Sequence, residues 1–115
     1  MRLKSVIWVA AYVRRCHLEG AFAVVRRRGA EEAGAIFVKV SRLDGTAALY
    51  APAPQSDFDE AKPGDRRFVP VLPDLYAPDT DIEGRLSREM KFDTDVWIVE
   101  VEDRAGRHFL DLGDS

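Results

Sequence analysis

The chain has 115 residues, of which 46% are hydrophobic and 32% charged, and its formal net charge is −3. This composition is typical of a soluble single domain and excludes collagen-like, disulfide-rich and disordered chains. One cysteine, Cys16, excludes an internal disulfide, and the longest apolar run, residues 6–13, is shorter than the ~20 residues that a membrane-spanning helix needs. We therefore predict one domain over residues 1–115, without a membrane partner.

The residues directly after the apolar run predict the location of the protein. A secretory signal peptide would place the small residues of a cleavage site there. Arg14 and Arg15 occupy those positions instead. We therefore expect a cytoplasmic protein.

The charges are distributed unevenly along the chain. Residues 1–45 contain nine Lys or Arg and four Asp or Glu, a formal charge of +5, whereas residues 46–115 contain eight and sixteen, a formal charge of −8. Such an asymmetry can mark an anion-binding half, or the two halves can face each other inside one fold or across a dimer. We favour the second interpretation.

The first segment, residues 3–17, has the spacing of an amphipathic helix. Basic residues near its C-terminal end suit the helix dipole, and Gly20 offers a stop. The residues that share its predicted core side are Leu3, Ile7, Ala11 and Leu18, with Trp8 and Tyr12 alongside. Trp8 and the later Trp97 are most simply anchors of the core, because each lies within an apolar stripe.

The next part of the chain is rich in β-branched and aromatic residues, which predicts strands over residues 21–28, 35–43 and 46–51. The dipeptide Asp44-Gly45 indicates a two-residue hairpin turn, because a type I′ turn needs positive φ at both central positions. The connections fit an antiparallel meander.

The hairpin turn fixes which residues of the meander share a face. With Leu43 opposite Thr46, Val40 lies opposite Leu49, and an apolar face results. The opposite face then gathers cations and aromatic rings from all three strands, if residues 29–34 close a symmetric hairpin. These residues are Arg26, Arg28, Phe37, Lys39 and Tyr50.

Prolines and acidic residues predict an irregular excursion over about residues 52–66, outside the core. Residues 67–72 predict a short edge strand and residues 79–91 a second helix. An alternating strand over 96–103 is expected to return through a turn as residues 107–112. Together these elements predict an α+β domain, in which an antiparallel sheet of five or six strands, a β-meander plus a C-terminal hairpin, packs against two helices.

Motifs for catalysis or cofactor binding do not occur in the sequence. There is no G-x-S-x-G or H-E-x-x-H, and Gly29 and Gly34 have P-loop spacing without the Lys-Ser/Thr that would reach a phosphate. Cys16 and His17 are adjacent, so on a helix they do not face each other. The acidic pairs at 79/81 and 93/95 lack the further ligands of a calcium loop. An enzyme with a novel carboxylate site stays open, but we favour a non-catalytic protein without cofactor or metal.

The mixed face of cations and rings is the candidate binding surface. Exposed rings can stack nucleobases while Arg and Lys neutralise phosphates. Alternatively, a helix covers this face and the arginine tips extend past it. The acidic net charge weighs against nucleic acid. The leading hypothesis is therefore a non-catalytic interaction protein, a homodimer or one with an unidentified protein partner, and single-strand nucleic-acid binding is the alternative.

Four sequence blocks resemble a known family. The blocks are residues 8–15 (WVAAYVRR), 29–34 (GAEEAG) followed by 38–40 (VKV), 42–46 (RLDGT) and 95–104 (DVWIVEVEDR). Together they are similar, over nearly the whole chain, to short alphaproteobacterial proteins grouped as domain-of-unknown-function family 1491. The resemblance implies a stand-alone bacterial cytosolic protein. It implies no catalytic residues, because the family has no assigned activity.

Overall fold

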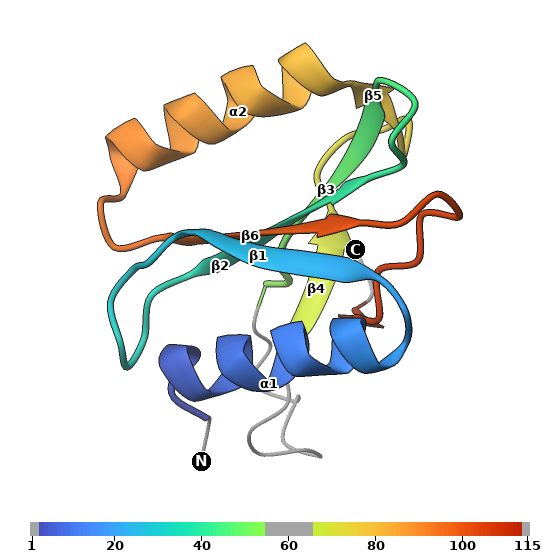
Figure 1. The fold of residues 1–115 in the computed structure, drawn as a ribbon. Helices are drawn as coiled ribbons and strands as arrows, with labels where there is room; N and C mark the ends of the chain where they lie inside the picture. Colours follow the sequence, from blue (N-terminus) through green and yellow to red (C-terminus); the bar gives the residue numbers. More distant parts are fainter. Residues whose placement is uncertain (1–2, 55–65, 114–115) are drawn as a thin grey trace.

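The computed structural model describes residues 3–54 and 66–113. Two helices enclose a mixed sheet, one on each of its faces (Figure 1). In chain order the elements are α1 (Ser5–Leu18), β1 (Phe22–Arg27), β2 (Ile36–Ser41), β3 (Thr46–Pro52), β4 (Arg67–Pro70), β5 (Ala77–Pro78), α2 (Asp79–Phe92), β6 (Trp97–Glu102) and β7 (Asp111–Leu112). The α+β class with two helices is confirmed. Most of the predicted excursion over 52–66 lies outside the described residues.

The sheet is mixed, whereas the sequence predicted a purely antiparallel one. Its strand order is β1-β6-β2-β3-β4-β7, with β5 paired to β3 off this path. β6 lies between β1 and β2, antiparallel to the first and parallel to the second, so the predicted meander is wrong. The physical reason is that three successive residues of β6, Trp97, Ile98 and Val99, are buried. Both faces of this strand are covered, which is typical of a central position in a sheet.

The predicted C-terminal hairpin is also wrong. β7 does not return along β6 but pairs in parallel with β4. The segment before β7 instead packs against α1, where the hydroxyl of Tyr12 donates a hydrogen bond to the carbonyl oxygen of His108 at 2.6 Å. This bond joins residues 96 positions apart, and no local sequence pattern could predict it.

The hairpin of β2 and β3 is confirmed, but its register differs by one residue from the prediction. Val40 pairs with Ala48 and Lys39 with Leu49. The turn is longer than expected, and two of its residues have a positive φ, 64° at Leu43 and 89° at Gly45. A shift of one residue moves each side chain of β3 to the other face relative to β2.

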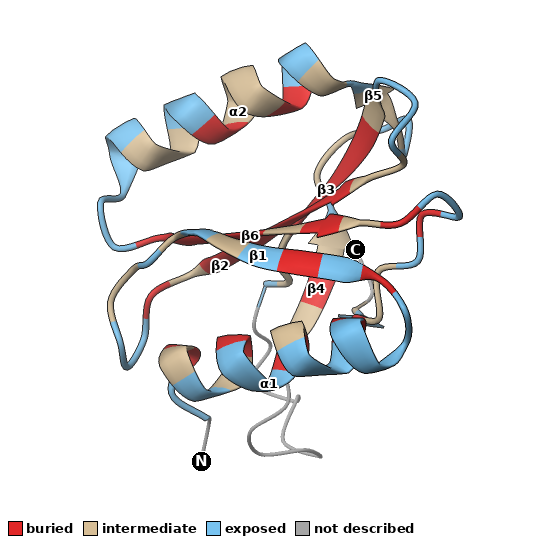
Figure 2. Cartoon of the chain, in the orientation of Figure 1, coloured by how far each residue is buried: buried red, intermediate tan, exposed pale blue. Residues whose placement is uncertain are grey.

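Helix α1 forms where it was predicted, but the other side of it packs against the sheet. Its buried residues are Ser5, Val9, Tyr12 and Cys16. The predicted core residues Leu3, Ile7 and Leu18 are instead 45%, 50% and 75% exposed. Figure 2 shows this outward side of α1 in the colour of exposed residues. The periodicity was therefore predicted correctly and its direction was not.

Helix α2 covers the opposite face of the sheet (Figure 1). Ile82 and Leu86, four residues apart, are 0% and 1% exposed and pack in one cluster with Phe37, Leu49 and Ile98. The cluster on the α1 side contains Val38, Val99 and Tyr50, among others. The sheet therefore separates two apolar cores, one under each helix.

Candidate functional site

The structure does not bring the five predicted site residues together on one open face. Phe37 and Lys39 lie under α2 and are 8% and 3% exposed. Tyr50 is 2% exposed on the α1 side, where its ring centroid lies 5.1 Å from that of His108. The register of the hairpin separates Lys39 from Tyr50. The single mixed face expected from the sequence is therefore wrong, and these three side chains are covered.

The two predicted arginines have other contacts. The guanidinium carbon of Arg28 lies 5.1 Å from the ring centroid of Trp97, within the range of a cation–π contact. Arg26 donates two hydrogen bonds to Glu83, at 2.6 and 2.7 Å, and a third to Glu100 at 3.1 Å. Arg26 thus lies beside Lys39, on the side of the sheet that α2 covers.

Lys39 is the centre of an ion cluster between β2, β6 and α2. Its Nζ lies 2.6 Å from Oδ1 of Asp79, 2.6 Å from Oε2 of Glu83 and 3.8 Å from Oε2 of Glu100. Two cations from the basic half of the sequence therefore meet three carboxylates from the acidic half. At this cluster basic and acidic residues of the two halves pair inside one chain, in line with the favoured interpretation.

The electrostatics of the cluster follow from these contacts. Hydrogen bonds from Arg26, and then from Lys39, lower the pKa of Glu83 to about 2. Burial is the largest influence on Lys39 and opposes its charge, yet the hydrogen bonds to Asp79 and Glu83 leave its pKa raised above the usual value. Glu83 and Lys39 therefore keep their charges at neutral pH, and their ion pair holds α2 on the sheet.

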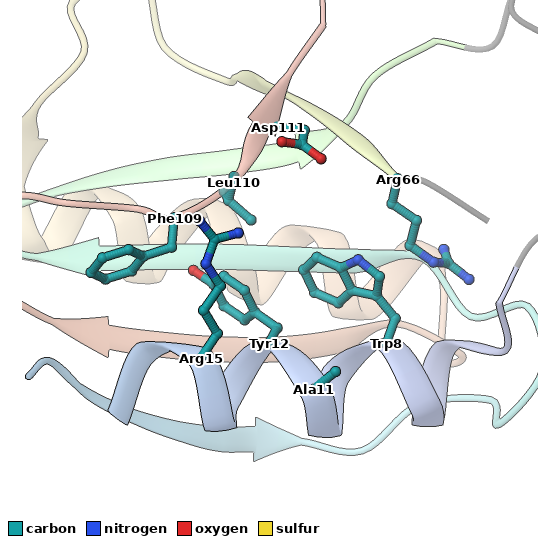
Figure 3. A pocket seen from close by; sticks show the side chains of 8 residues that line it. All are labelled: Trp8, Ala11, Tyr12, Arg15, Arg66, Phe109, Leu110 and Asp111. Atoms are coloured by element: carbon teal, nitrogen blue, oxygen red, sulfur yellow. The ribbon is translucent and has the colours of Figure 1, made fainter. Parts of the chain in front are cut away.

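A cavity of about 170 Å³ lies between α1 and the segment that leads into β7 (Figure 3). It opens beside the half-buried ring of Trp8. The residues that line it are Trp8, Ala11, Tyr12, Arg15, Arg66, Phe109, Leu110 and Asp111. None of the five predicted site residues is among them.

The aromatic side of the cavity is a stack of rings. The rings of Trp8 and Tyr12, four residues apart on α1, are nearly parallel at 15° with centroids 4.8 Å apart. Phe68 supports Trp8 from the sheet at 5.2 Å. Burial raises the pKa of the Tyr12 phenol well above its usual value, so its hydroxyl stays protonated and keeps its bond to His108.

The charged side of the cavity is formed by two arginines and one carboxylate. Arg66 is buried at 6% exposure, and its Nη2 donates to the carbonyl oxygen of Leu3 at 2.9 Å and to Oγ of Ser5 at 3.1 Å. Arg15 extends from α1 toward Phe109 and Leu110 (Figure 3). Asp111, at the start of β7, is the one carboxylate that lines the cavity among the described residues.

The sequence reasoning missed this site because its parts are far apart in the chain. One side of α1 carries four of the lining residues, Trp8, Ala11, Tyr12 and Arg15. Their i, i+3, i+4 and i+7 spacing indicates that they share this side of the helix, but it does not indicate a cavity. Trp8 is only half-buried, whereas the prediction of a core anchor is confirmed for Trp97, whose Nε1 donates to the carbonyl oxygen of Ala30 at 2.8 Å. No local pattern links α1 to residues 109–111.

The thiol and the acidic residues are the other groups that could carry chemistry. Cys16 is fully buried and burial raises its thiol pKa, so it has the character of a core residue. Within residues 3–54 and 66–113, no group of three or more His, Cys, Asp or Glu could hold a metal ion. Neither α1 nor α2, the helices of that part of the chain, is long and apolar enough to cross a membrane.

Comparison with known proteins places the chain in a family. The family model described as "Protein of unknown function (DUF1491)" matches residues 3–111. No curated protein matches the chain.

Solved structures with the same fold come from alphaproteobacteria. The crystal structure of a DUF1491 family protein from Caulobacter crescentus is 38% identical, with a TM-score of 0.79, and the match covers 99% of this chain and 100% of that one. The solution structure of protein Atu0922 from A. tumefaciens is 43% identical, with a TM-score of 0.81, over 100% and 98%. An NMR structure of a C. crescentus DUF1491 family protein is 41% identical, with a TM-score of 0.79, over 100% and 99%. The chain therefore belongs to the DUF1491 family, whose function is unknown.

Proposed function

We propose that the protein is a non-catalytic interaction protein of the cytoplasm that self-associates through the outward side of α1. The observation that carries this proposal is that exposed apolar side chains lie on the outward side of α1, opposite the side that the fold covers. Leu3, Ile7 and Leu18 are 45%, 50% and 75% exposed and follow this side, with the exposed Arg14 among them. Exposed apolar residues gathered on one surface are typical of interaction sites.

A second copy of the chain suits this surface by its charge and shape. Between Ser5 and Leu18 the helix has no acidic residue, but Lys4 precedes it and Glu19 follows it. In an antiparallel pair, Glu19 of each copy would approach Lys4 of the other at both ends of the interface. Opposite charges at both ends favour the two-fold symmetry that most homodimers use.

The apolar contacts fit the same arrangement. An antiparallel pair places Leu3 of one copy against Leu18 of the other. The two small residues at its centre, Ala10 and Ala11, are both exposed and allow the helix axes to approach closely. One helix side is smaller than a standard interface, so we expect a Kd on the order of 10 μM.

The cytoplasmic location is supported by the place of α1 and by the cysteine. Residues 6–13, which form the long apolar run, are part of α1 and supply Val9 and Tyr12 to the core. Cys16 is a buried free thiol. Free thiols are usual in the reducing cytoplasm, whereas small secreted domains are commonly rich in disulfides.

Sedimentation of the whole chain tests the proposal. From about 1 μM to about 1 mM, the weight-average mass should rise from that of a monomer toward that of a dimer. Ile7→Lys should remain monomeric throughout, because the antiparallel pair places residue 7 against Arg14 of the other copy, and two cations there repel each other. Phe92→Lys is the matched control: Phe92 is 89% exposed but lies at the end of α2, so this variant should dimerise like the unmodified chain. A monomer at every concentration, or equal dimerisation of Ile7→Lys, would refute the proposal.

Single-strand nucleic-acid binding remains the alternative prediction. It needs rings that are open to bases, and the burial of Phe37 and Tyr50 gives it no support. A titration with a fluorescent oligonucleotide at two salt concentrations checks it, because phosphate contacts make affinity fall with salt.

A further inference from the structure

We infer that the cavity between α1 and residues 109–111 binds a small aromatic acid that also carries a hydrogen-bond donor. This site uses the Trp8 side of α1, whereas the proposed self-association uses the Leu3, Ile7 and Leu18 side, and Ala11 borders both. The inference does not rest on the proposed function and extends beyond it.

The size and apolar walls of the cavity set the ligand class. At about 170 Å³, the cavity is smaller than the roughly 300–1,000 Å³ typical of sites for drug-sized ligands. It therefore suits a single ring rather than a nucleotide or a dinucleotide. The ring of Trp8 is half-buried and lines the cavity together with Ala11, Phe109 and Leu110. A planar ligand can stack or pack edge-on against these groups.

Arg15 is the cation that can receive an anion in the cavity. Its side chain extends toward Phe109 and Leu110 (Figure 3), and Asp111 is the one carboxylate among the described residues that line the cavity. A guanidinium presents parallel N–H donors that match the two oxygens of a carboxylate. Arg66 also lines the cavity, but its Nη2 is bound to the carbonyl oxygen of Leu3 and to Oγ of Ser5, and its guanidinium points away from Arg15 (Figure 3).

Asp111 adds a second requirement. Its carboxylate can only accept hydrogen bonds when ionised. It would repel a ligand that presents nothing but negative charge, and it would accept a bond from a hydroxyl or amino group of the ligand. A ring with an acid group and a separate O–H or N–H donor satisfies both Arg15 and Asp111.

The wall of the cavity also contains a strained backbone. Phe109 has a φ of 56°, a conformation that bulky residues rarely adopt. Two hydrogen bonds to His108, the residue before Phe109, hold this conformation. Nδ1 of His108 accepts from the backbone N–H of Leu110 at 2.9 Å, and its carbonyl oxygen accepts from the hydroxyl of Tyr12. Such outliers cluster at ligand sites, and this one places Phe109 and Leu110 at the cavity.

The test is an NMR titration of ¹⁵N-labelled protein with 4-hydroxybenzoate as the probe. The chain has two tryptophans, and their indole N–H signals report different places. That of Trp8 should move to saturation with a Kd on the order of 1 mM, which is usual for a ligand of this size. That of Trp97, 1% exposed in the core and bound to the carbonyl oxygen of Ala30, should stay still. The Ile7→Lys background keeps self-association out of the measurement.

Matched ligands and variants decide the outcome. Neutral 4-hydroxybenzamide has the same ring and donor and should bind at least tenfold more weakly. Arg15→Gln should weaken 4-hydroxybenzoate about tenfold, as expected for the loss of a charge-assisted contact. Arg14→Gln removes the same charge from an adjacent exposed residue that does not line the cavity, and should change the Kd less than twofold. No shift at Trp8, equal binding of the amide, or equal effects of the two arginine variants would overturn the inference.

Discussion

Lys39 and Glu83, 44 residues apart, join the sheet to the helix above it through a bond of 2.6 Å between Nζ and Oε2. Lys39 is 3% exposed. A buried ammonium is costly unless it is paired and hydrogen-bonded. Here Asp79 and Glu83, from the first two turns of α2, supply that pairing. The side chain that the sequence predicted as part of an open binding face is thus the anchor of α2.

The cluster makes stability depend on pH. The pKa of Glu83 is about 2 in the folded chain against 4.5 ordinarily, so the folded state binds the proton less tightly than the unfolded state. Its contribution is complete above about pH 5 and is lost as pH falls toward 2. Glu83→Gln should therefore lower the free energy of unfolding by about 1–2 kcal/mol at pH 7, after allowance for solvent screening, and by much less at pH 2.

Urea unfolding at both pH values measures this difference. Glu89→Gln is the control on the same helix, because among the described residues the one ion pair of Glu89 is the (i, i+4) pair with Arg85 at 3.2 Å. Its loss should cost about 0.5 kcal/mol or less. If Glu83→Gln were no more destabilising at pH 7 than at pH 2, the charge of Glu83 would not be what stabilises α2 on the sheet.

Two glycines should respond in opposite ways to substitution by alanine. A Cβ at Gly29 would collide with the carbonyl oxygen of Asp95 and lie 2.7 Å from Cδ1 of Trp97, whereas one at Gly84 in α2 meets nothing within 4 Å. We expect Gly29→Ala to destabilise by about 2–4 kcal/mol, as other overpacked sites do. Gly84→Ala should stabilise by about 0.5–1 kcal/mol, because alanine favours the helix. Thermal unfolding of the two variants side by side checks both signs, and a shared sign would contradict the close packing at Gly29.

How much of this molecule could be predicted from its sequence depends on whether the signal was local. Helix α2 and the hairpin of β2 and β3 have local signals, periodic Ile82 and Leu86 in one case and Asp44-Gly45 in the other, and both elements form. The partner of β6 has no local signal. The first three residues of β6 are apolar on both faces, which suits more than one neighbour, and chain order favoured the wrong one.

The prediction of which side of α1 is buried and the failure to predict the cavity have related causes. Apolar residues lie on two sides of α1, and only the packed sheet decides which side is covered. The cavity needs Trp8 beside Phe109, which the bond from Tyr12 to His108 secures over 96 positions. Contacts of this separation are set by the whole fold, and periodicity carries no information about them.

Tyr12→Phe tests that long-range bond directly. The hydroxyl of Tyr12 is 2.6 Å from the carbonyl oxygen of His108. Its removal leaves a partly buried acceptor without this donor, which should cost about 1 kcal/mol while the aromatic ring keeps its packing. The midpoint of urea unfolding should fall with an unchanged slope. Amide exchange should accelerate most in residues 108–112, and uniform acceleration across the chain would show that the bond does not hold this segment in particular.

Leu43→Asn should stabilise the hairpin whose turn differed from the prediction. Leu43 has a φ of 64° and is 47% exposed, so its side chain gains little from burial while its backbone is strained. Asparagine tolerates this conformation far better than leucine does. We expect a gain of about 0.5–1 kcal/mol in the free energy of unfolding. Leu75→Asn is the control, since Leu75 is 40% exposed without a positive φ, and it should change stability by less than about 0.5 kcal/mol. An equal effect of both variants would mean that the polarity of the new side chain, and not the conformation of Leu43, sets the gain.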